Sequence, residues 1–460
     1  MPAQPIQSAK LQSIGTAGIP RLILAFSVPA IISMIVESLY NIVDRYFVGV
    51  GVGYLGIAGI TLCFPIMLFI MAMSMIVGIG GNTLFAIRLG AKKYSQASLI
   101  LNNSFALLII MGFSAFALGE LLMDPLLRSF GASEATLPYA KDYLRIILLG
   151  SVFSTITPGM NHFIRSMGHP KTAMFRNLIG AGLNTVLDAL FILKFHWGIQ
   201  GAAWATFISQ LVTSAFVMEF FFKRDTPIKI RRRSMALQFP YVRRIFIMGF
   251  PPSVMQICNS LMNVILNKSL SHYGNLSAYG GDMAISAFGI VNSIAMVAVM
   301  PIMGFVQGAQ PIIGYNYGAH NYPRVRKTLK YVLFYSVGFM CLEWIVIQIN
   351  AGNFAGSFAA GNTQLQELAS RSLRTFLFAL PLIGAGMTCS NFFQGTGKPF
   401  HSLILNMCRQ VLILIPMLLI IPRFLGLRGV FMAGPVADTC AAILSAFLLS
   451  RELKRMRKED

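Results

Sequence analysis

The chain has 460 residues, of which 55% are hydrophobic and only 12% are charged. Soluble globular chains carry a charge on about a quarter of their residues, so this composition excludes a soluble multidomain protein. The mean hydropathy of +0.67 and the repeated apolar runs predict a polytopic membrane protein, with the lipid bilayer as its main partner.

Apolar runs of about twenty residues, the length that crosses a bilayer as a helix, recur along the whole chain. Several runs are longer than a bilayer needs, which predicts tilted or kinked helices. We predict twelve spans, near residues 22–50, 55–85, 97–119, 140–160, 173–194, 199–222, 245–271, 284–314, 328–349, 372–393, 401–421 and 429–450.

The basic residues are distributed unevenly across the predicted membrane. The net charge is +21, which in a soluble chain would indicate a nucleic-acid partner. Here 25 of the 37 Lys and Arg residues lie in segments on one side of the spans and nine on the other. Because cytoplasmic loops carry the excess of Lys and Arg, we expect both termini in the cytoplasm, a multi-pass protein of the cell inner (plasma) membrane, and no nucleic-acid partner.

Short motifs of the first six spans recur in the last six at nearly constant spacing. Such self-similarity indicates an internal repeat. The matching pairs, at offsets of 222 to 229, are Pro29 with Pro251, Asn41 with Asn263, GAKKY (90–94) with GAHNY (318–322), SMGHP (166–170) with GTGKP (395–399), and Gly201 with Gly429.

The repeat predicts two lobes. The N-lobe covers residues 1–222, and the C-lobe covers residues 245–460 and ends in a basic tail. A basic cytoplasmic linker at residues 223–244 joins them. Six is an even number of spans, so the repeat is parallel, with a pseudo-twofold axis along the membrane normal. The predicted fold is an all-α membrane protein of twelve transmembrane helices in two six-helix lobes around a central cleft. This arrangement favours alternating access.

Polar groups in the N-lobe fall on shared helix faces, at spacings of three or four residues. Asp44, Asp188 and Thr206 lie six or seven residues from the outer ends of their spans, so they are expected at one depth. The groups on these faces are Glu37, Asn41 and Asp44 in the first span, Asn184 and Asp188 in the fifth, and Thr206 and Gln210 in the sixth.

Two carboxylates, an amide oxygen and a hydroxyl form a set of hard ligands for Na⁺ or for a shared proton. In a low dielectric both carboxylates do not stay ionised, so Asp44 and Asp188 are expected to titrate as one unit. The alternative is that each residue satisfies a neighbouring helix or its own backbone. The predicted cation or proton site, with Na⁺ as a candidate metal, is Asp44, Asn184, Asp188 and Thr206, with Glu37, Asn41 and Gln210 as accessory residues.

The C-lobe differs at the corresponding positions, which hold Leu266, Ile413, Met417 and Gly434. The ion site is therefore predicted in one lobe only. Span 7 carries an uncharged polar stripe that either lines the substrate cleft or bonds neighbouring helices. We also predict that Arg409 and Asp438 pair with each other in a structural role. The stripe residues assigned to the cleft are Gln256, Asn259 and Asn263.

Four segments resemble the multidrug and toxic compound extrusion (MATE) family, closest to its bacterial DinF-like branch. They are ESLYNIVDRYFVG (37–49), GAGLNTVLDALFI (180–192), GAAWATFISQ (201–210) and RSMGHPK (165–171). The resemblance covers nearly the whole chain and implies the same fold of two six-helix lobes around a cleft.

The resemblance also implies site residues. It assigns the N-lobe cation site to Asp44, Asn184, Asp188 and Thr206, and it places the bend of the first helix at Pro29. NorM-like members carry a carboxylate in helix 7, where this chain has Asn259, so a second Na⁺ site in the C-lobe is not expected.

The expected function is secondary antiport, in which H⁺ or Na⁺ drives export of amphipathic, mostly cationic compounds. Motifs of enzymes are absent, so we expect no enzymatic activity and no cofactor beyond the coupling ion, and we expect a monomer. One alternative is a lipid-linked saccharide flippase of the same superfamily, for which Arg45 and Arg409 are the candidate cationic residues. A channel or a membrane enzyme is the second alternative.

Overall fold

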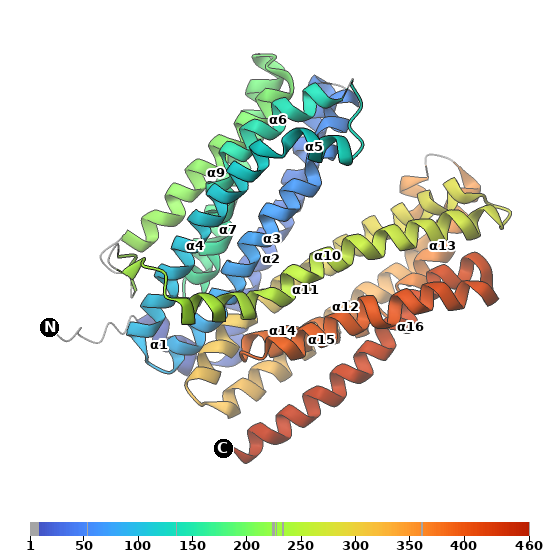
Figure 1. Cartoon of the computed structure of the whole chain (residues 1–460). Helices are drawn as coiled ribbons and strands as arrows, with labels where there is room; N and C mark the ends of the chain where they lie inside the picture. The colour runs from blue at the N-terminus through green and yellow to red at the C-terminus, as the bar shows by residue number, and fades with distance from the viewer. Residues whose placement is uncertain are drawn as a thin grey trace. The chain divides into compact units, whose positions relative to one another are not determined.

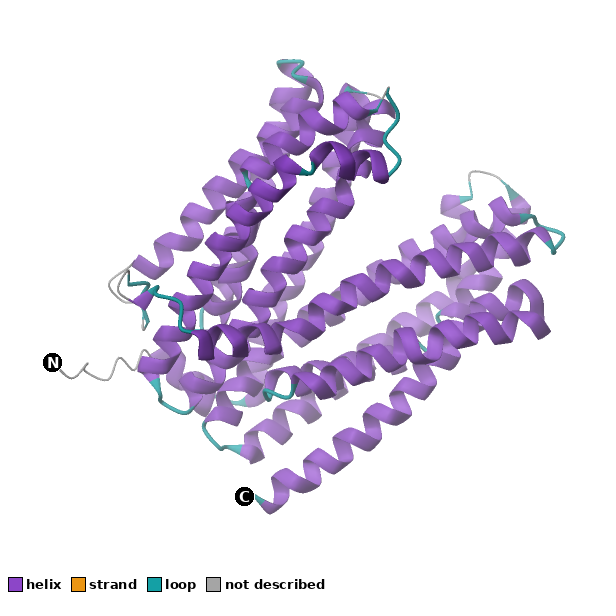
Figure 2. Cartoon of the chain, in the orientation of Figure 1, coloured by secondary structure: helices purple, strands orange, loops and turns teal. Residues whose placement is uncertain are grey.

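The computed structural model describes residues 9–52, 54–134, 136–222, 226, 228–231, 234–359 and 362–459. Figure 2 shows this part of the chain as helices joined by short turns and loops. Long apolar runs form helices because a backbone surrounded by lipid must satisfy its hydrogen bonds within its own segment.

The described residues fall into two compact units. Unit 1 contains those up to Gly18, those from Leu24 to Ser253, and Gly314–His320. Unit 2 contains Ile19–Ile23, Val254–Ile313 and the residues from Asn321 onward. The predicted lobe boundary at residues 223–244 stays a prediction.

Unit 1 contains the helices of the first six predicted spans, except the first five residues of α2, Ile19–Ile23. Helices α3, α4 and α7 pack against one another, α6 packs on α3 and α9, and α8 packs on α9 (Figure 1). The bounds are α1 (Ala9–Thr16), α2 (Ile19–Gly51), α3 (Tyr54–Gly90), α4 (Tyr94–Leu121), α5 (Met123–Ser129), α6 (Leu137–Leu149), α7 (Ser151–Ser166), α8 (Pro170–Asp188), the π-helix η1 (Ala189–Lys194) and α9 (Gly198–Phe222).

Unit 2 contains most of the remaining helices. Helix α12 packs against α13 and α14, and α14 packs against α15 and α16. The bounds are α10 (Phe239–Asn275), α11 (Gly281–Gly318), α12 (Tyr322–Phe358), α13 (Thr363–Phe376), α14 (Leu380–Gly395), α15 (Pro399–Met407), the π-helix η3 (Cys408–Ile413) and α16 (Leu414–Lys458).

Each predicted span corresponds to a helix or to a bent helix pair. Eight described helices are long and apolar enough to cross a membrane, and ten if the bent pairs α6–α7 (54°) and α13–α14 (47°) each count as one span. Gly426, at φ 56° and ψ −140°, separates two helices within the long stretch Pro399–Lys458. Helix α10, with 37 residues and several polar side chains, is the remaining span.

The outer surface of the helices is apolar, as a lipid-facing surface must be. Phe69 and Phe113 are each 61% exposed, and Phe334 is 71% exposed, although all three lie in the middle of long helices. In water such side chains would form large apolar patches. Their exposure therefore supports a membrane setting for the chain.

The described part of the basic linker is bonded to α4 by two adjacent, fully buried asparagines. The Asn102 amide accepts from Arg231 N at 2.7 Å and donates to Lys229 O at 3.3 Å. The Asn103 amide accepts from Gln238 N at 2.8 Å and donates to Ala236 O at 3.4 Å. Each side chain thus pairs with the linker backbone through both of its polar ends.

Candidate ion-binding site

The candidate site in unit 1 is built around the junction of α8 and the π-helix η1. Asp188 is the last residue of α8, and its side chain is fully buried. In η1 the Phe195 N–H bonds to Leu190 O, five residues earlier, at 3.0 Å. Single π-turns are rare within helices and frequent at functional sites, so this junction is a candidate site on backbone grounds alone.

Asn184 lies one turn before Asp188 and links it to Thr206 of α9. All three residues are buried. The Asn184 amide lies 3.3 Å from Thr206 Oγ1. With the amide turned to satisfy both of its ends, it donates to Asp188 Oδ2 at 2.9 Å and accepts from Thr206 N at 3.2 Å. The structure therefore brings three of the four predicted site residues into one hydrogen-bonded group.

The fourth predicted residue, Asp44 of α2, completes this group. Its carboxyl group lies close enough to that of Asp188 for the two to interact directly. A carboxylate only accepts hydrogen bonds, so a direct bond between the two groups would need a proton on one of them. Asp188 Oδ1 is buried with no N–H or O–H donor from the described residues. A proton or a small cation between the carboxyls would satisfy that oxygen.

Two tyrosines near the carboxyl pair were not identified from the sequence. Tyr40 of α2 and the buried Tyr143 of α6 both lie within electrostatic range of Asp44 and Asp188. Tyr40 precedes Asp44 by four residues, so its position on the same helix face was readable from the sequence. Tyr143 carries no such signal because only tertiary packing brings α6 to this place.

The accessory residues lie in different surroundings. Gln210 accepts a hydrogen bond from Ser154 Oγ of α7. Glu37 lies within electrostatic range of Arg165, which is buried at the end of α7. The side chain of Asn41 lies outside those described. Roles for Glu37, Asn41 and Gln210 at the ion site stay predictions.

Helix α2 runs without interruption past Pro29, the predicted bend. Pro29 is buried and has no N–H to donate to the preceding turn. Its own carbonyl accepts from Ser33 Oγ at 2.9 Å. The position combines a missing helical hydrogen bond with a hydroxyl bonded into the backbone, and both features favour local bending.

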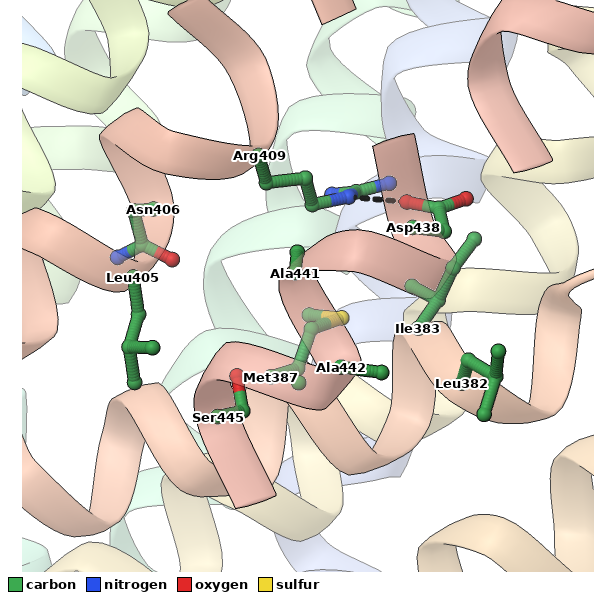
Figure 3. A pocket seen from close by; sticks show the side chains of 11 residues that line it. Leu382, Ile383, Met387, Leu405, Asn406, Arg409, Asp438, Ala441, Ala442 and Ser445 are labelled. Atoms are coloured by element: carbon green, nitrogen blue, oxygen red, sulfur yellow. Dashed lines mark hydrogen bonds and ion pairs between the residues drawn. The ribbon is translucent and has the colours of Figure 1, made fainter. Parts of the chain in front are cut away.

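The C-terminal half holds a charged pair of a different kind. Arg409 Nε of η3 donates to Asp438 Oδ1 of α16 at 2.5 Å, which confirms the predicted pairing (Figure 3). On α10, Asn263 donates to Asn259 O at 2.9 Å and is otherwise exposed. The side chain of Gln256 lies outside those described.

Among the described residues no cluster of three or more His, Cys, Asp and Glu is placed to hold a metal ion. A cation at the candidate site would therefore depend on two carboxyl groups supplemented by the Asn184 amide and the Thr206 hydroxyl. That set is suited to a proton or to Na⁺, and not to a tightly bound transition metal.

Comparison with known proteins extends the similarity over the whole chain. The multidrug export protein MepA of Staphylococcus haemolyticus (strain JCSC1435) is 27% identical over 93% of this chain and 93% of its own length. A solved structure described as MATE in the bent conformation is 28% identical, with a TM-score of 0.91 over 98% of this chain and 99% of its own. An outward-facing structure of a multidrug resistance MATE family transporter of the MOP superfamily is 28% identical, with a TM-score of 0.90 over 98% of this chain and 99% of its own.

The MatE family profile matches residues 29–190 and 251–420, one stretch in each half of the repeat. These two stretches contain three of the four residues of the candidate ion site, and Thr206 lies outside them. They also contain Asn259 and Arg409. The matched residues make up most of the chain, and the chain belongs to the MatE family of multidrug and toxic compound extrusion transporters.

Proposed function

We propose that this transporter is a secondary antiporter that exports small amphipathic, mostly cationic compounds in exchange for H⁺ or Na⁺. Family membership and the multidrug export names of its relatives support the cargo class. The observation that carries the coupling is the proximity of the Asp44 and Asp188 carboxyl groups, beside Asn184 and Thr206.

The carboxyl pair has the chemistry of a coupling site. Two carboxylates cannot both be ionised at contact distance in a low dielectric unless a proton or a cation lies between them. Loss of that ion leaves two like charges that repel, so helix α2 and helix α8 would pack differently in the loaded and unloaded states. A two-state packing of this kind is what an antiporter needs to link ion movement to cargo movement.

The ion pair of Arg409 and the carboxyl pair of the first unit favour drug export over a lipid-linked saccharide flippase or a channel. A lipid-linked saccharide carries a pyrophosphate, which needs unengaged cationic side chains. Of the two candidates, Arg409 is instead paired with Asp438, and the side chain of Arg45 lies outside those described. A channel needs no site that alternates between two loaded states, whereas a proton-sharing carboxyl pair in one unit provides such a site.

We further propose that the protein is a monomer of the plasma membrane with both termini in the cytoplasm. It uses no cofactor beyond its coupling ion. The excess of Lys and Arg in alternate connecting segments supports this orientation. Cysteine labelling of the chain ends in intact cells tests the orientation directly, and light scattering of the detergent-solubilised protein tests the oligomeric state.

Transport by proteoliposomes under an imposed pH gradient, and separately under an imposed Na⁺ gradient, tests the proposal. Export of a cationic dye should follow at least one gradient and stop when that gradient is dissipated. Exchange of labelled dye for unlabelled dye at equilibrium should also occur, because a carrier binds before it moves its cargo. Dye movement that ignores both gradients and shows no exchange would rule out antiport.

A further inference from the structure

The end of α12 where α13 begins differs in charge from the equivalent place in the first half. Helix α4 corresponds to α12 at an offset of 228, and the bent pair α6–α7 corresponds to α13–α14 at an offset of 229. The bounds of α7, Ser151 and Ser166, match the bounds of α14, Leu380 and Gly395, at that offset. The two places can therefore be compared residue by residue.

In the first half, two ion pairs join the ends of these helices. Lys141 Nζ of α6 lies 2.6 Å from Asp124 Oδ2 of α5. Arg145 Nε of α6 lies 4.0 Å from Glu120 Oε2 of α4. Each of these two basic residues thus faces a carboxylate of the same chain.

In the second half, the sequence has lost both carboxylates and kept the arginine. Glu120 corresponds to Gln348, Asp124 corresponds to Gly352, and the retained arginine is Arg374. Gln348 Nε2 donates to Arg374 O at 2.9 Å, so it contacts the backbone of Arg374 and not its charged group. Within the described part of the chain, the Arg374 guanidinium makes no hydrogen bond or ion pair.

A recess lies at the place of the lost carboxylates. It has a volume of about 350 Å³, opens to the surface, and is lined by both Gly352 and Arg374. This volume is within the range of small-ligand sites, roughly 300–1,000 Å³. A Cβ atom added to Gly352 would have no atom within 4 Å. An exposed arginine needs no partner, so it is the recess beside Arg374 that points to a ligand.

The other groups that line the recess are polar and come from α13. Thr363 and Ser370 supply hydroxyl groups, which can donate hydrogen bonds. The acidic lining residue, Glu367, lies 2.5 Å from Arg371 Nη2 and is paired with it. That pair is neutral as a whole, so the charge of Arg374 makes the recess positive.

We infer that this recess is a binding site for a phosphate group, which pairs with Arg374 in place of the carboxylate that the first half provides. A guanidinium group binds phosphate through two parallel N–H bonds. The hydroxyl groups of Thr363 and Ser370 suit the remaining phosphate oxygens, and a phosphate group fills more of the recess than a carboxylate does. The site lies outside the candidate ion site, and the inference does not depend on the proposed antiport.

The phosphate group has two sources, because the recess lies where membrane-spanning helices end. One is the headgroup of an anionic phospholipid, and the other is a soluble phosphate compound. Equilibrium binding to the purified protein in detergent distinguishes them. Radiolabelled phosphatidylglycerol in mixed micelles is compared with a diacylglycerol of the same chains, which has no phosphate. Radiolabelled inorganic phosphate is measured in competition with chloride at constant ionic strength.

Two pairs of variants test the residues, with the probe that the wild type binds. Gly352→Asp places a carboxylate in the recess, as Asp124 does in the first half, and should weaken binding about tenfold. Gly352→Asn, the matched control, has the same size without the charge and should bind nearly as well as the wild type. Arg374→Gln should weaken binding by a similar factor, whereas Arg145→Gln, at the repeat-equivalent arginine that faces Glu120, should not. If Gly352→Asp does not accumulate, Arg374→Gln carries the test.

Preference for phosphatidylglycerol alone identifies a lipid headgroup as the ligand, and binding of inorganic phosphate identifies a soluble compound. A wild type that prefers neither probe over its reference overturns the inference. Equal binding by Gly352→Asp and Gly352→Asn overturns it as well, and so does an equal loss in Arg374→Gln and Arg145→Gln, which would indicate surface charge in general. Failure of the proposed function shows in vesicle transport and leaves these binding results unaffected.

Discussion

Gly90 of α3 and Gly318 of α11, which correspond in the internal repeat, each contact the other's helix at the equivalent point. A Cβ atom added to Gly90 would lie 1.8 Å from Tyr315 O, and one added to Gly318 would lie 1.9 Å from Ile87 O. Residues 87 and 315 are related by the same offset of 228 as the two glycines. The contact is therefore symmetric, with backbone against backbone on both sides.

Gly90→Ala and Gly318→Ala should each destabilise the protein. Neither close contact is with a flexible side chain, so the helices must separate to admit a methyl group, which costs about 1–3 kcal/mol for an overpacked site. Thermal unfolding of the purified protein in detergent should show a lower midpoint for both. Gly289→Ala, in the same helix α11 with no atom within 4 Å of the added Cβ, is the control and should match the wild type.

The sequence predicted the helices well because their cause is local. A run of about twenty apolar residues must form a helix in lipid. The break at Gly426 lies between the predicted spans 11 and 12, and the bends of spans 4 and 10 lie inside those spans. The glycine contact was not predictable from one motif. The GAKKY and GAHNY resemblance located both glycines, but only tertiary packing shows that they meet the partner helix at equivalent positions.

Asp44→Asn and Asp188→Asn should abolish ion-coupled export while the protein still folds and inserts. An asparagine keeps the size of the side chain but cannot hold a proton between two carboxyl groups, so the loaded state loses its charge dependence. The measurement is drug resistance of cells at equal expression, with gradient-driven efflux from vesicles beside it. Wild-type resistance in either variant would contradict a coupling role for that carboxyl.

Asp438→Asn is the matched acidic control in the second unit. An asparagine oxygen can still accept from Arg409 Nε, so the contact with η3 is weakened but not lost. Substantial transport should therefore remain. An equal loss of coupling in Asp438→Asn, Asp44→Asn and Asp188→Asn would indicate a second coupling site and refute its confinement to the first half.

Drug affinity should fall as the pH is lowered, or as Na⁺ is added if Na⁺ is the coupling ion. A proton or Na⁺ between Asp44 and Asp188 removes a negative charge that attracts a cationic drug, and linkage makes the competition reciprocal. Equilibrium binding of a cationic dye to purified protein from pH 5 to 8, with and without Na⁺, measures this. Asp44→Asn should flatten the dependence, and a flat wild-type curve in both titrations would exclude the mechanism.

The site was readable from the sequence where helical spacing carried it. Asn184 and Asp188 are one turn apart on α8, and their expected depth in the membrane matched that of Thr206 and Asp44, which lie beside them. Tyr143 and the contact between Gln410 and Asn259 were missed because they depend on which helices touch. The C-lobe positions equivalent to the ion site hold apolar residues, while the polar contacts of this half lie at other positions around η3.

Asn102→Ala combined with Asn103→Ala should release the linker from α4. Each asparagine makes a two-way bond with the linker backbone and is fully buried, so both the linker and the helix lose partners. Limited trypsin digestion should cut within residues 229–244 several-fold faster than in the wild type. Asn350→Ala, which removes an exposed amide bonded only to Val346 O, is the control and should leave the cleavage rate unchanged.

The Arg409–Asp438 pair should behave as a coupled unit when its members are replaced singly and together. Arg409→Met alone leaves the buried Asp438 carboxylate without its partner, so it should destabilise the protein by about 3–5 kcal/mol. Asp438→Leu alone leaves the charge of Arg409, whose side chain is 36% exposed, so it should destabilise the protein by less. Replacement of both by apolar residues of similar size removes both charges, and the cost should shrink well below the sum of the two. Thermal or denaturant unfolding of the four proteins in detergent gives the coupling energy directly. Additive losses would mean that the two side chains do not depend on each other, and the anchoring of η3 by this ion pair would then be wrong.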